Sequence, residues 1–139
     1  MDIIELPRKI VVQKGALEKI EEVVSSLGSE FLIVVDPITK EIAGESVKKK
    51  INGEFFIIKD STIEDVKRLE SGDCDCIISV GGGKVVDVGK LAAHNKKIPF
   101  VSVPTSCSHD GIASRNASIT ENGKSRSFIA TAPFGVVAD

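Results

Sequence analysis

Short apolar runs recur along the chain, separated by amphipathic stretches. The runs lie at residues 9–12, 31–35, 55–58, 76–80 and 98–103. Unbroken apolar runs of this length are typical of strands that are covered on both faces of a sheet. The pattern therefore predicts a series of buried strands.

The stretches between these runs carry apolar residues at helical spacing. Leu17, Ile20 and Val23 form such a stripe ahead of Gly28, which can end a helix, and a second helical stretch follows Asp36-Pro37 through Ile51. Strand and helix continue to alternate along the chain. We therefore expect an α/β fold, a Rossmann-like, doubly wound parallel sheet with right-handed crossovers and helices on both faces.

The alternation changes after the run that ends at residue 103. Residues 114–120 and 124–130 alternate polar and apolar side chains around Asn122-Gly123, a strong signal for a hairpin turn. A last apolar run, 134–138, predicts a strand that no helix follows before Asp139. We expect one domain over residues 1–139, with an added hairpin at about 114–130. Because a strand is predicted at the very end of the sequence, we also expect this polypeptide to be truncated.

Composition and charge narrow the class of protein. A chain of 139 residues with 42% hydrophobic and 27% charged residues suits one globular domain. A net charge of −2 without a basic face argues against a nucleic-acid partner. Because no apolar run could span a membrane and the start lacks a signal-peptide layout, we expect a cytoplasmic protein without membrane insertion. The spacing of Cys74, Cys76 and Cys107 predicts reduced packing cysteines.

Three glycines connect a buried strand directly to a predicted helix. Residues 79–90 read SVGGGKVVDVGK. Glycines let the backbone approach a diphosphate, and the free N–H groups and positive dipole end of a helix attract its charge. A tight turn would need only one glycine, so the run favours phosphate binding. It is neither a GxGxxG fingerprint nor a Walker A loop.

A hydroxyl-rich segment follows the next predicted strand. Residues 103–114 read VPTSCSHDGIAS. Strands of a doubly wound sheet open onto a ligand crevice at their carboxyl ends, so we expect this segment and the glycines to face one cleft. Of the two histidines, His94 is most simply a helix-end cation, whereas His109 adjoins Asp110 and could assist at the cleft.

Together the two segments resemble the superfamily of iron-containing alcohol dehydrogenases, glycerol dehydrogenases and dehydroquinate synthases. Its pattern GGGxxxDxxK is matched by Gly81, Gly82, Gly83, Asp87 and Lys90. Within that superfamily, residues 103–114 most resemble the sn-glycerol-1-phosphate dehydrogenases, which set the stereochemistry of archaeal membrane lipids. The resemblance spans nearly the whole chain. It implies the N-terminal domain of a dehydroquinate synthase-like fold, with an α-helical C-terminal domain after residue 139.

The resemblance also implies that the chain holds NAD or NADP. The expected contacts come from the glycine loop, the turn after it and the hydroxyl-rich segment. The implied cofactor-binding residues are Gly81, Gly82, Gly83, Lys84, Val85, Val86, Asp87, Thr105, Ser106, Cys107, Ser108 and Ser114. Asp36 ends the second strand, where a carboxylate can bind the adenine-ribose hydroxyls, although Asp-Pro is also an ordinary turn.

The substrate that the resemblance implies is dihydroxyacetone phosphate, reduced to sn-glycerol 1-phosphate. Asp110 would bind its hydroxyls or carbonyl end, and an N-cap or loop aspartate is the structural alternative. Lys90 could neutralise the substrate phosphate, or it could be a solvated helix lysine. For Asp87 the alternative to a cofactor contact is a favourable charge in the first helical turn.

Enzymes of this type bind one zinc through an aspartate and two histidines of the C-terminal domain, so no metal ligand and no catalytic residue is expected in this chain. The zinc would polarise the substrate carbonyl for hydride attack. We expect the chain alone to bind NAD(P)H weakly and to be catalytically inactive, and its own C-terminal domain to be its partner.

Other functions remain open on the sequence. A glycerol dehydrogenase-like or dehydroquinate synthase-like enzyme could use the same glycine loop, and a stand-alone nucleotide-binding module would also suit the length of 139 residues. The sequence does not decide between NAD and NADP, and it allows a homo-oligomer.

Overall fold

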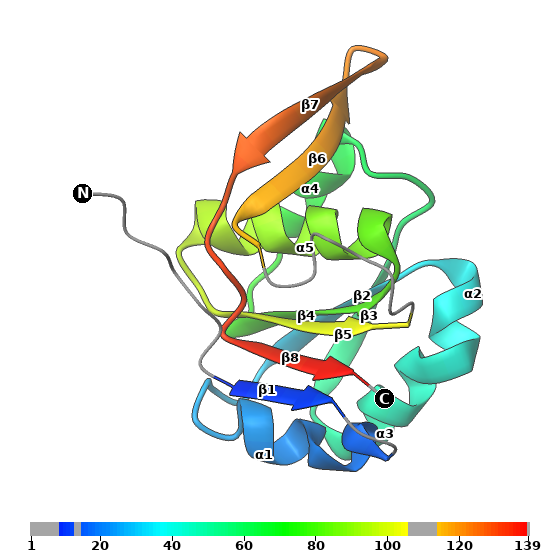
Figure 1. The fold of residues 1–139 in the computed structure, drawn as a ribbon, viewed down its shortest axis with the longest axis vertical. Helices are drawn as coiled ribbons and strands as arrows, with labels where there is room; N and C mark the ends of the chain where they lie inside the picture. Colours follow the sequence, from blue (N-terminus) through cyan, green and yellow to red (C-terminus); the bar gives the residue numbers. More distant parts are fainter. Residues whose placement is uncertain (1–8, 13–14, 106–113, 139) are drawn as a thin grey trace.

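The protein is described by a computed structural model over residues 9–12, 15–105 and 114–138. Its centre is a six-stranded sheet in the order β1-β8-β5-β4-β2-β3 (Figure 1), in which every neighbouring pair is parallel. The strands of this sheet are β1 (Lys9–Val12), β2 (Phe31–Val35), β3 (Gly53–Ile57), β4 (Cys76–Gly81), β5 (Phe100–Pro104) and β8 (Gly135–Ala138). The expected doubly wound α/β fold is thus confirmed.

Helical segments cover both faces of the sheet. They are η1 (Ala16–Lys19), α1 (Ile20–Val24), α2 (Pro37–Thr39), η2 (Lys40–Gly44), α3 (Glu45–Lys50), α4 (Ile63–Glu70) and α5 (Gly83–Lys96). The first five cover one face, and α4 and α5 cover the other (Figure 1). None of the helices in the described ranges is long and apolar enough to cross a membrane.

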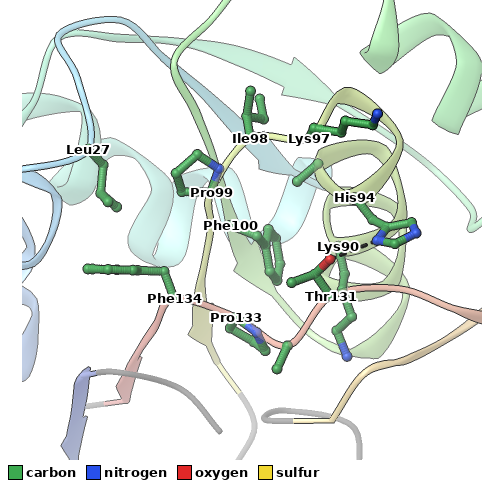
Figure 2. Close-up of a pocket in the computed structure, with 12 residues that line it drawn as sticks. Leu27, Lys90, His94, Lys97, Ile98, Pro99, Phe100, Thr131, Pro133 and Phe134 are labelled. Atoms are coloured by element: carbon green, nitrogen blue, oxygen red, sulfur yellow. Dashed lines mark hydrogen bonds between the residues drawn. The ribbon is translucent and has the colours of Figure 1, made fainter. Parts of the chain in front are cut away.

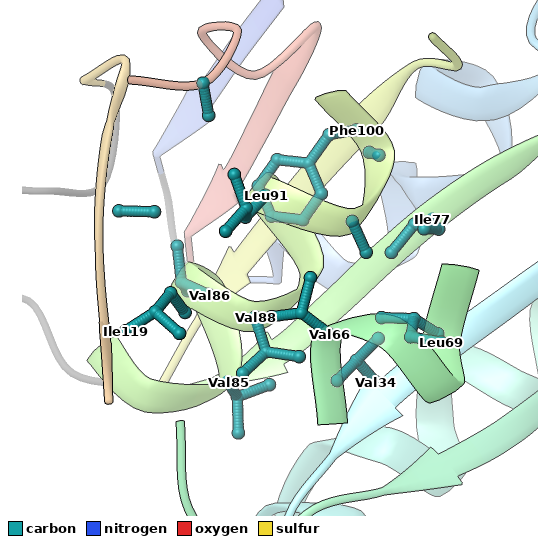
Figure 3. Close-up of a cluster of buried hydrophobic side chains, with 14 of the residues drawn as sticks. Val34, Val66, Leu69, Ile77, Val85, Val86, Val88, Leu91, Phe100 and Ile119 are labelled. Atoms are coloured by element: carbon teal, nitrogen blue, oxygen red, sulfur yellow. The ribbon is translucent and has the colours of Figure 1, made fainter. Parts of the chain in front are cut away.

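Each face of the sheet has its own apolar core, because side chains alternate along a strand. Ile33 and Val35 of β2 pack toward α1 and α3, whereas Val34 between them packs toward α4 and α5. Figure 3 shows the second core, in which Val66, Leu69 and the apolar face of α5 surround Val34 and Ile77. The fully buried strands explain the unbroken apolar runs of the sequence.

Several boundaries differ from the predicted ones. The predicted helix through Ile51 consists of three consecutive segments, and the middle one, η2, is a π-helix. Strand β5 begins at Phe100 instead of Ile98, because Ile98 donates its N–H to the carbonyl of Ala93 at 3.1 Å and so belongs to the end of α5. The bounds of other strands also differ by one or two residues at either end, and the order of elements is as expected.

The predicted hairpin is present as a separate two-stranded sheet. Strands β6 (Asn116–Glu121) and β7 (Lys124–Ile129) pair antiparallel around Asn122 and Gly123, whose φ angles are 53° and 77°. Positive φ at both central residues identifies the type I′ turn that Asn-Gly favours. The hairpin rests on α5 through the buried Ala117 and Ile119.

Candidate functional site

The chain leaves the carboxyl ends of two neighbouring strands in opposite directions. Strand β2 continues into α2 on one face of the sheet, and its neighbour β4 continues into α5 on the other face. Diverging connections of this kind leave a crevice between them, which is where doubly wound sheets bind ligands. The candidate site is therefore the crevice between the ends of β2 and β4.

The glycine loop forms one wall of this crevice. Strand β4 ends at Gly81, Gly82 is the N-cap of α5, and the helix runs from Gly83 for 14 residues. The carbonyl of Gly82 accepts the N–H of Val86 at 3.0 Å. The N–H groups before Val86 cannot find an acceptor inside the helix, and together with the helix dipole they make a position suited to an anion.

Gly81 and Gly82 differ in the atoms that would surround an added Cβ atom. A Cβ atom on Gly81 would lie 2.9 Å from Val85 Cβ and 3.2 Å from Thr39 Oγ1, so packing within the chain excludes a side chain there. A Cβ atom on Gly82 would meet no atom of the described residues within 4 Å, and its φ of −83° is ordinary for any residue. None of the described residues therefore fills the space in front of Gly82.

Asp36 stands on the opposite wall of the crevice as the N-cap of α2. Its Oδ1 accepts the N–H groups of Ile38 and Thr39 at 2.9 and 2.8 Å, and Thr39 Oγ1 accepts the N–H of Asp36 in return at 3.1 Å. This capping box was not predicted, although the spacing of Asp36 and Thr39 is its usual signal. Thr39 joins the two walls because its hydroxyl lies against Gly81.

The hydroxyl-rich segment begins beside the glycine loop, as predicted. Pro104 is the register partner of Gly81, and the N–H of Thr105 donates to the Gly81 carbonyl at 3.1 Å. Ser106, Cys107, Ser108, His109 and Asp110 lie outside the described residues, so their predicted roles stay predictions. Ser114 is described, and its Oγ accepts the N–H of Asn116 at 3.3 Å.

The first turn of α5 divides between core and solvent. The side chains of Val85 and Val86 are buried, with 1% and 4% exposed, so these residues could meet a ligand only through their backbone. Lys84 is exposed, and its Nζ lies 3.3 Å from Asp60 Oδ1. The N–H of Ser61, which donates to Asp60, lowers the pKa of this carboxyl, and the charge of Lys84 lowers it further. Asp87 is half-buried on the same turn.

Lys90 is fully buried, so the alternative of a solvated helix lysine is wrong. Its exposed fraction is 0%, and its Nζ donates to the carbonyl oxygen of Asn116 at 2.9 Å. Burial lowers the pKa of Lys90, while the charge of Asp87 acts in the opposite direction. The lysine expected to meet a substrate phosphate therefore already binds the backbone of the hairpin.

A cavity of about 660 Å³ lies at the other end of the sheet (Figure 2). It is bordered by the start of β5 at Phe100, the end of α5 and the segment that leads into β8. His94 lies at its rim and its Nδ1 is 2.7 Å from Thr131 Oγ1. Nothing in the sequence predicted this cavity, and it is separate from the crevice at the glycine loop.

Within the described part of the chain, no three His, Cys, Asp or Glu side chains lie close enough together to hold a metal ion. The described polar groups at the crevice are backbone N–H groups, hydroxyls, a lysine ammonium and the Asp36 and Asp87 carboxylates. This set is suited to a phosphorylated nucleotide.

Known proteins resemble the chain over nearly its full length. The model of the iron-containing alcohol dehydrogenase family matches residues 11–139. Glycerol-1-phosphate dehydrogenase, NAD(P)+, of Thermococcus sibiricus is 39% identical over 150 residues, and that of Pyrococcus furiosus is 42% identical over 149 residues. Both alignments cover 100% of this chain but only 43% of the relative.

Solved structures show the same fold. A probable glycerol dehydrogenase from Sinorhizobium meliloti superposes with a TM-score of 0.87 at 23% identity, covering 99% of this chain and 40% of that one. An iron-containing alcohol dehydrogenase from Thermotoga maritima gives a TM-score of 0.86 at 19% identity, covering 100% of this chain and 48% of that one. These similarities confirm the α/β architecture predicted from the sequence.

Proposed function

The chain belongs to the iron-containing alcohol dehydrogenase family, and from that premise we propose that it is the cofactor-binding domain of an NAD(P)H-dependent sn-glycerol-1-phosphate dehydrogenase. The reaction is the reduction of dihydroxyacetone phosphate, and its product serves membrane phospholipid synthesis. Support for the substrate comes from the relatives at 39% and 42% identity, which are named glycerol-1-phosphate dehydrogenases.

The observation that carries the cofactor proposal is the open space in front of Gly82. Neither its backbone conformation nor packing against the described residues requires glycine there, whereas a diphosphate must approach the backbone of such a loop closely. The N–H groups of the first turn of α5 would bind the pyrophosphate, and Thr105, which is bonded to Gly81, would flank it.

Asp36 would bind the hydroxyls of the adenine ribose from the opposite wall. Its Oδ1 caps α2, so the carboxylate is held in one orientation at the end of β2, and Oδ2 takes no part in the cap. A fixed carboxylate at this strand end favours the free ribose hydroxyls of NADH over the 2′-phosphate of NADPH.

The remaining parts of the active site lie outside the described residues. We place Asp110 at the substrate, and we place the zinc ligands in a C-terminal domain, since the chain matches only 43% of the length of its relatives. The described residues do not offer a site for the metal. When bound, the reduced nicotinamide supplies the hydride that converts the ketone to the alcohol.

Titration of the purified chain with NADH and with NADPH tests the cofactor proposal. The chain contains no Trp and no Tyr, so energy transfer from these residues does not contribute to the nicotinamide emission. A saturable change that excess NAD+ reverses is expected, and its absence for both nucleotides would refute a cofactor-binding domain.

The substrate proposal is tested in an enzyme of the relatives' full length. A chimera in which this chain replaces the matching portion of the Pyrococcus furiosus relative provides it, with the unaltered relative as the control. Oxidation of NAD(P)H by dihydroxyacetone phosphate, with little oxidation by dihydroxyacetone, is the expected result. A preference for unphosphorylated dihydroxyacetone would instead support a glycerol dehydrogenase-like enzyme. The chain alone should reduce neither compound.

A further inference from the structure

The buried position of Lys90 calls for a specific acceptor. A lysine ammonium without a partner in an apolar interior is strongly unfavourable. Lys90 is 0% exposed on the face of α5 that the hairpin covers, and its Nζ donates to the Asn116 carbonyl at 2.9 Å. Figure 2 shows its side chain pointing away from His94, the neighbour one helical turn along.

Asn116, the acceptor of Lys90, is also bonded to Ser114, a residue predicted to contact the cofactor. Asn116 is the first residue of β6, and while its carbonyl accepts the Lys90 ammonium its N–H donates to Ser114 Oγ at 3.3 Å. Ala130, which directly follows β7, donates its N–H to the Arg115 carbonyl at 2.6 Å. The residues that return from the hydroxyl-rich segment are thus fixed from two sides.

A second lysine on α5 shows the same chemistry away from the crevice. Lys96, at the carboxyl end of the helix, donates to the carbonyls of Glu70 and Gly72 at 2.8 and 2.6 Å. These acceptors belong to the end of α4 and the turn after it, at the opposite end of the helix from the glycine loop. Lys96 therefore serves as a control for the loss of a lysine-to-backbone bond.

We propose that Lys90 is a positioning residue, which fixes Asn116 and through it Ser114 relative to the glycine loop on the same helix. The proposal rests on the proposed function of the crevice, but it replaces the predicted contact between Lys90 and a substrate phosphate. Because the glycine loop and Lys90 belong to one rigid element, the hydrogen bond from Lys90 to Asn116 contributes to the distance between the two segments that would enclose the nucleotide.

The test compares Lys90→Met, Lys90→Arg and Lys96→Met by titration of the chain with NADH and NADPH. Methionine keeps the apolar volume of the lysine stem and removes only the donor, so the fold should persist in all three variants, as circular dichroism will verify. Lys90→Met should weaken binding by up to about tenfold, because the free energy of one charge-assisted hydrogen bond limits the effect of losing its position. Lys90→Arg should restore part of the affinity, and Lys96→Met should leave it unchanged.

Two results would overturn the proposal. Equal weakening by Lys90→Met and Lys96→Met would mean a general effect of destabilisation. In the chimera, a rise of KM for dihydroxyacetone phosphate with an unchanged KM for NAD(P)H would mean that Lys90 contacts the substrate phosphate directly.

A structural measurement keeps this test independent of the proposed function. In 1H–15N spectra of the isotope-labelled chain, Lys90→Met should shift the amide signals of Ser114 and Asn116, whereas Lys96→Met should not. If the chain binds neither nucleotide, the cofactor proposal fails while these shifts still decide whether Lys90 positions this segment. Unchanged amide signals in Lys90→Met would refute the positioning role.

Discussion

A Cβ atom on Gly89 would lie 2.0 Å from Oγ of Ser79, so helix α5 rests directly on strand β4 at this point. The Ser79 hydroxyl is fully buried and donates to the Val85 carbonyl at 2.8 Å, one turn before Gly89. The strand that leads into the glycine loop is thereby joined to the helix that leaves it. The position of the loop depends on this contact.

Replacing Gly89 with alanine should destabilise the fold by about 1–3 kcal/mol, the usual range for an overpacked core. The added methyl would clash with Ser79 and would also lie 2.8 Å from the ring of Phe100. Urea denaturation measures the effect. The double variant with Ser79→Ala should recover part of the loss, since it removes the closest atom, and a single variant as stable as the parent would contradict the contact.

Gly82→Ala should change binding without a comparable change in stability. The methyl group would meet no atom of the described ranges within 4 Å, so the free energy of unfolding should change by less than about 1 kcal/mol. Titration with NADH should show an affinity reduced at least about tenfold, because the methyl would occupy the space proposed for the pyrophosphate. Unchanged affinity in a folded variant would mean that no ligand approaches this glycine.

Asp36 allows its capping role to be separated from its proposed role in binding. Asp36→Ala should cost about 1 kcal/mol of stability, measured by urea denaturation, because the cap of α2 is lost. Asp36→Ser keeps a capping oxygen and removes the charge, so stability should be largely retained while the affinity for NADPH rises relative to NADH. The same nucleotide preference in Asp36→Ser and the parent chain would argue against contact with the ribose.

Asp75 should contribute to stability in a pH-dependent way. The N–H groups of Ser29 and Glu30 donate to Oδ2 at 2.9 and 3.0 Å and lower the pKa of this carboxyl below its ordinary value of 3.8. The pKa of Asp75 is lower in the folded state than in the unfolded state. Its ionised carboxylate therefore stabilises the fold at pH values above the unfolded-state pKa, and this stabilisation is lost as the pH falls through the folded-state pKa.

Urea denaturation of the parent and of Asp75→Asn across this range tests the sign. The parent should be more stable than the variant at neutral pH, and the difference should shrink below about pH 4 as the carboxylate of the parent is protonated. A difference that stays constant with pH would show that the charge of Asp75 makes no contribution.

Much of the architecture could be predicted because its signals are local. The apolar run at residues 31–35 gives strand β2 with its exact bounds, and Asn122-Gly123 gives the hairpin turn. The adjacency of Gly81 and Thr105 could also be expected, since consecutive parallel strands commonly lie next to one another.

The interactions that could not be predicted join positions far apart in the chain. The acceptor of Lys90 is a backbone carbonyl 26 residues away, and a backbone group carries no sequence signal. The proximity of the Thr39 hydroxyl to Gly81 likewise joins positions far apart in the chain, and no sequence pattern indicates it. The sequence therefore indicates solvent or substrate as the neighbour of Lys90, whereas the side chain is buried beneath the hairpin.

The strand order has a consequence for the synthesis of the protein. Strand β8 lies between β1 and β5 and pairs with both. During translation β1 emerges first, yet the strand that it pairs with is the last of the described strands to leave the ribosome. Until β8 has been synthesised, the edge of β5 therefore stays unpaired. A stop codon shortly before Gly135 would remove β8 and would leave β1 without the strand that joins it to the sheet.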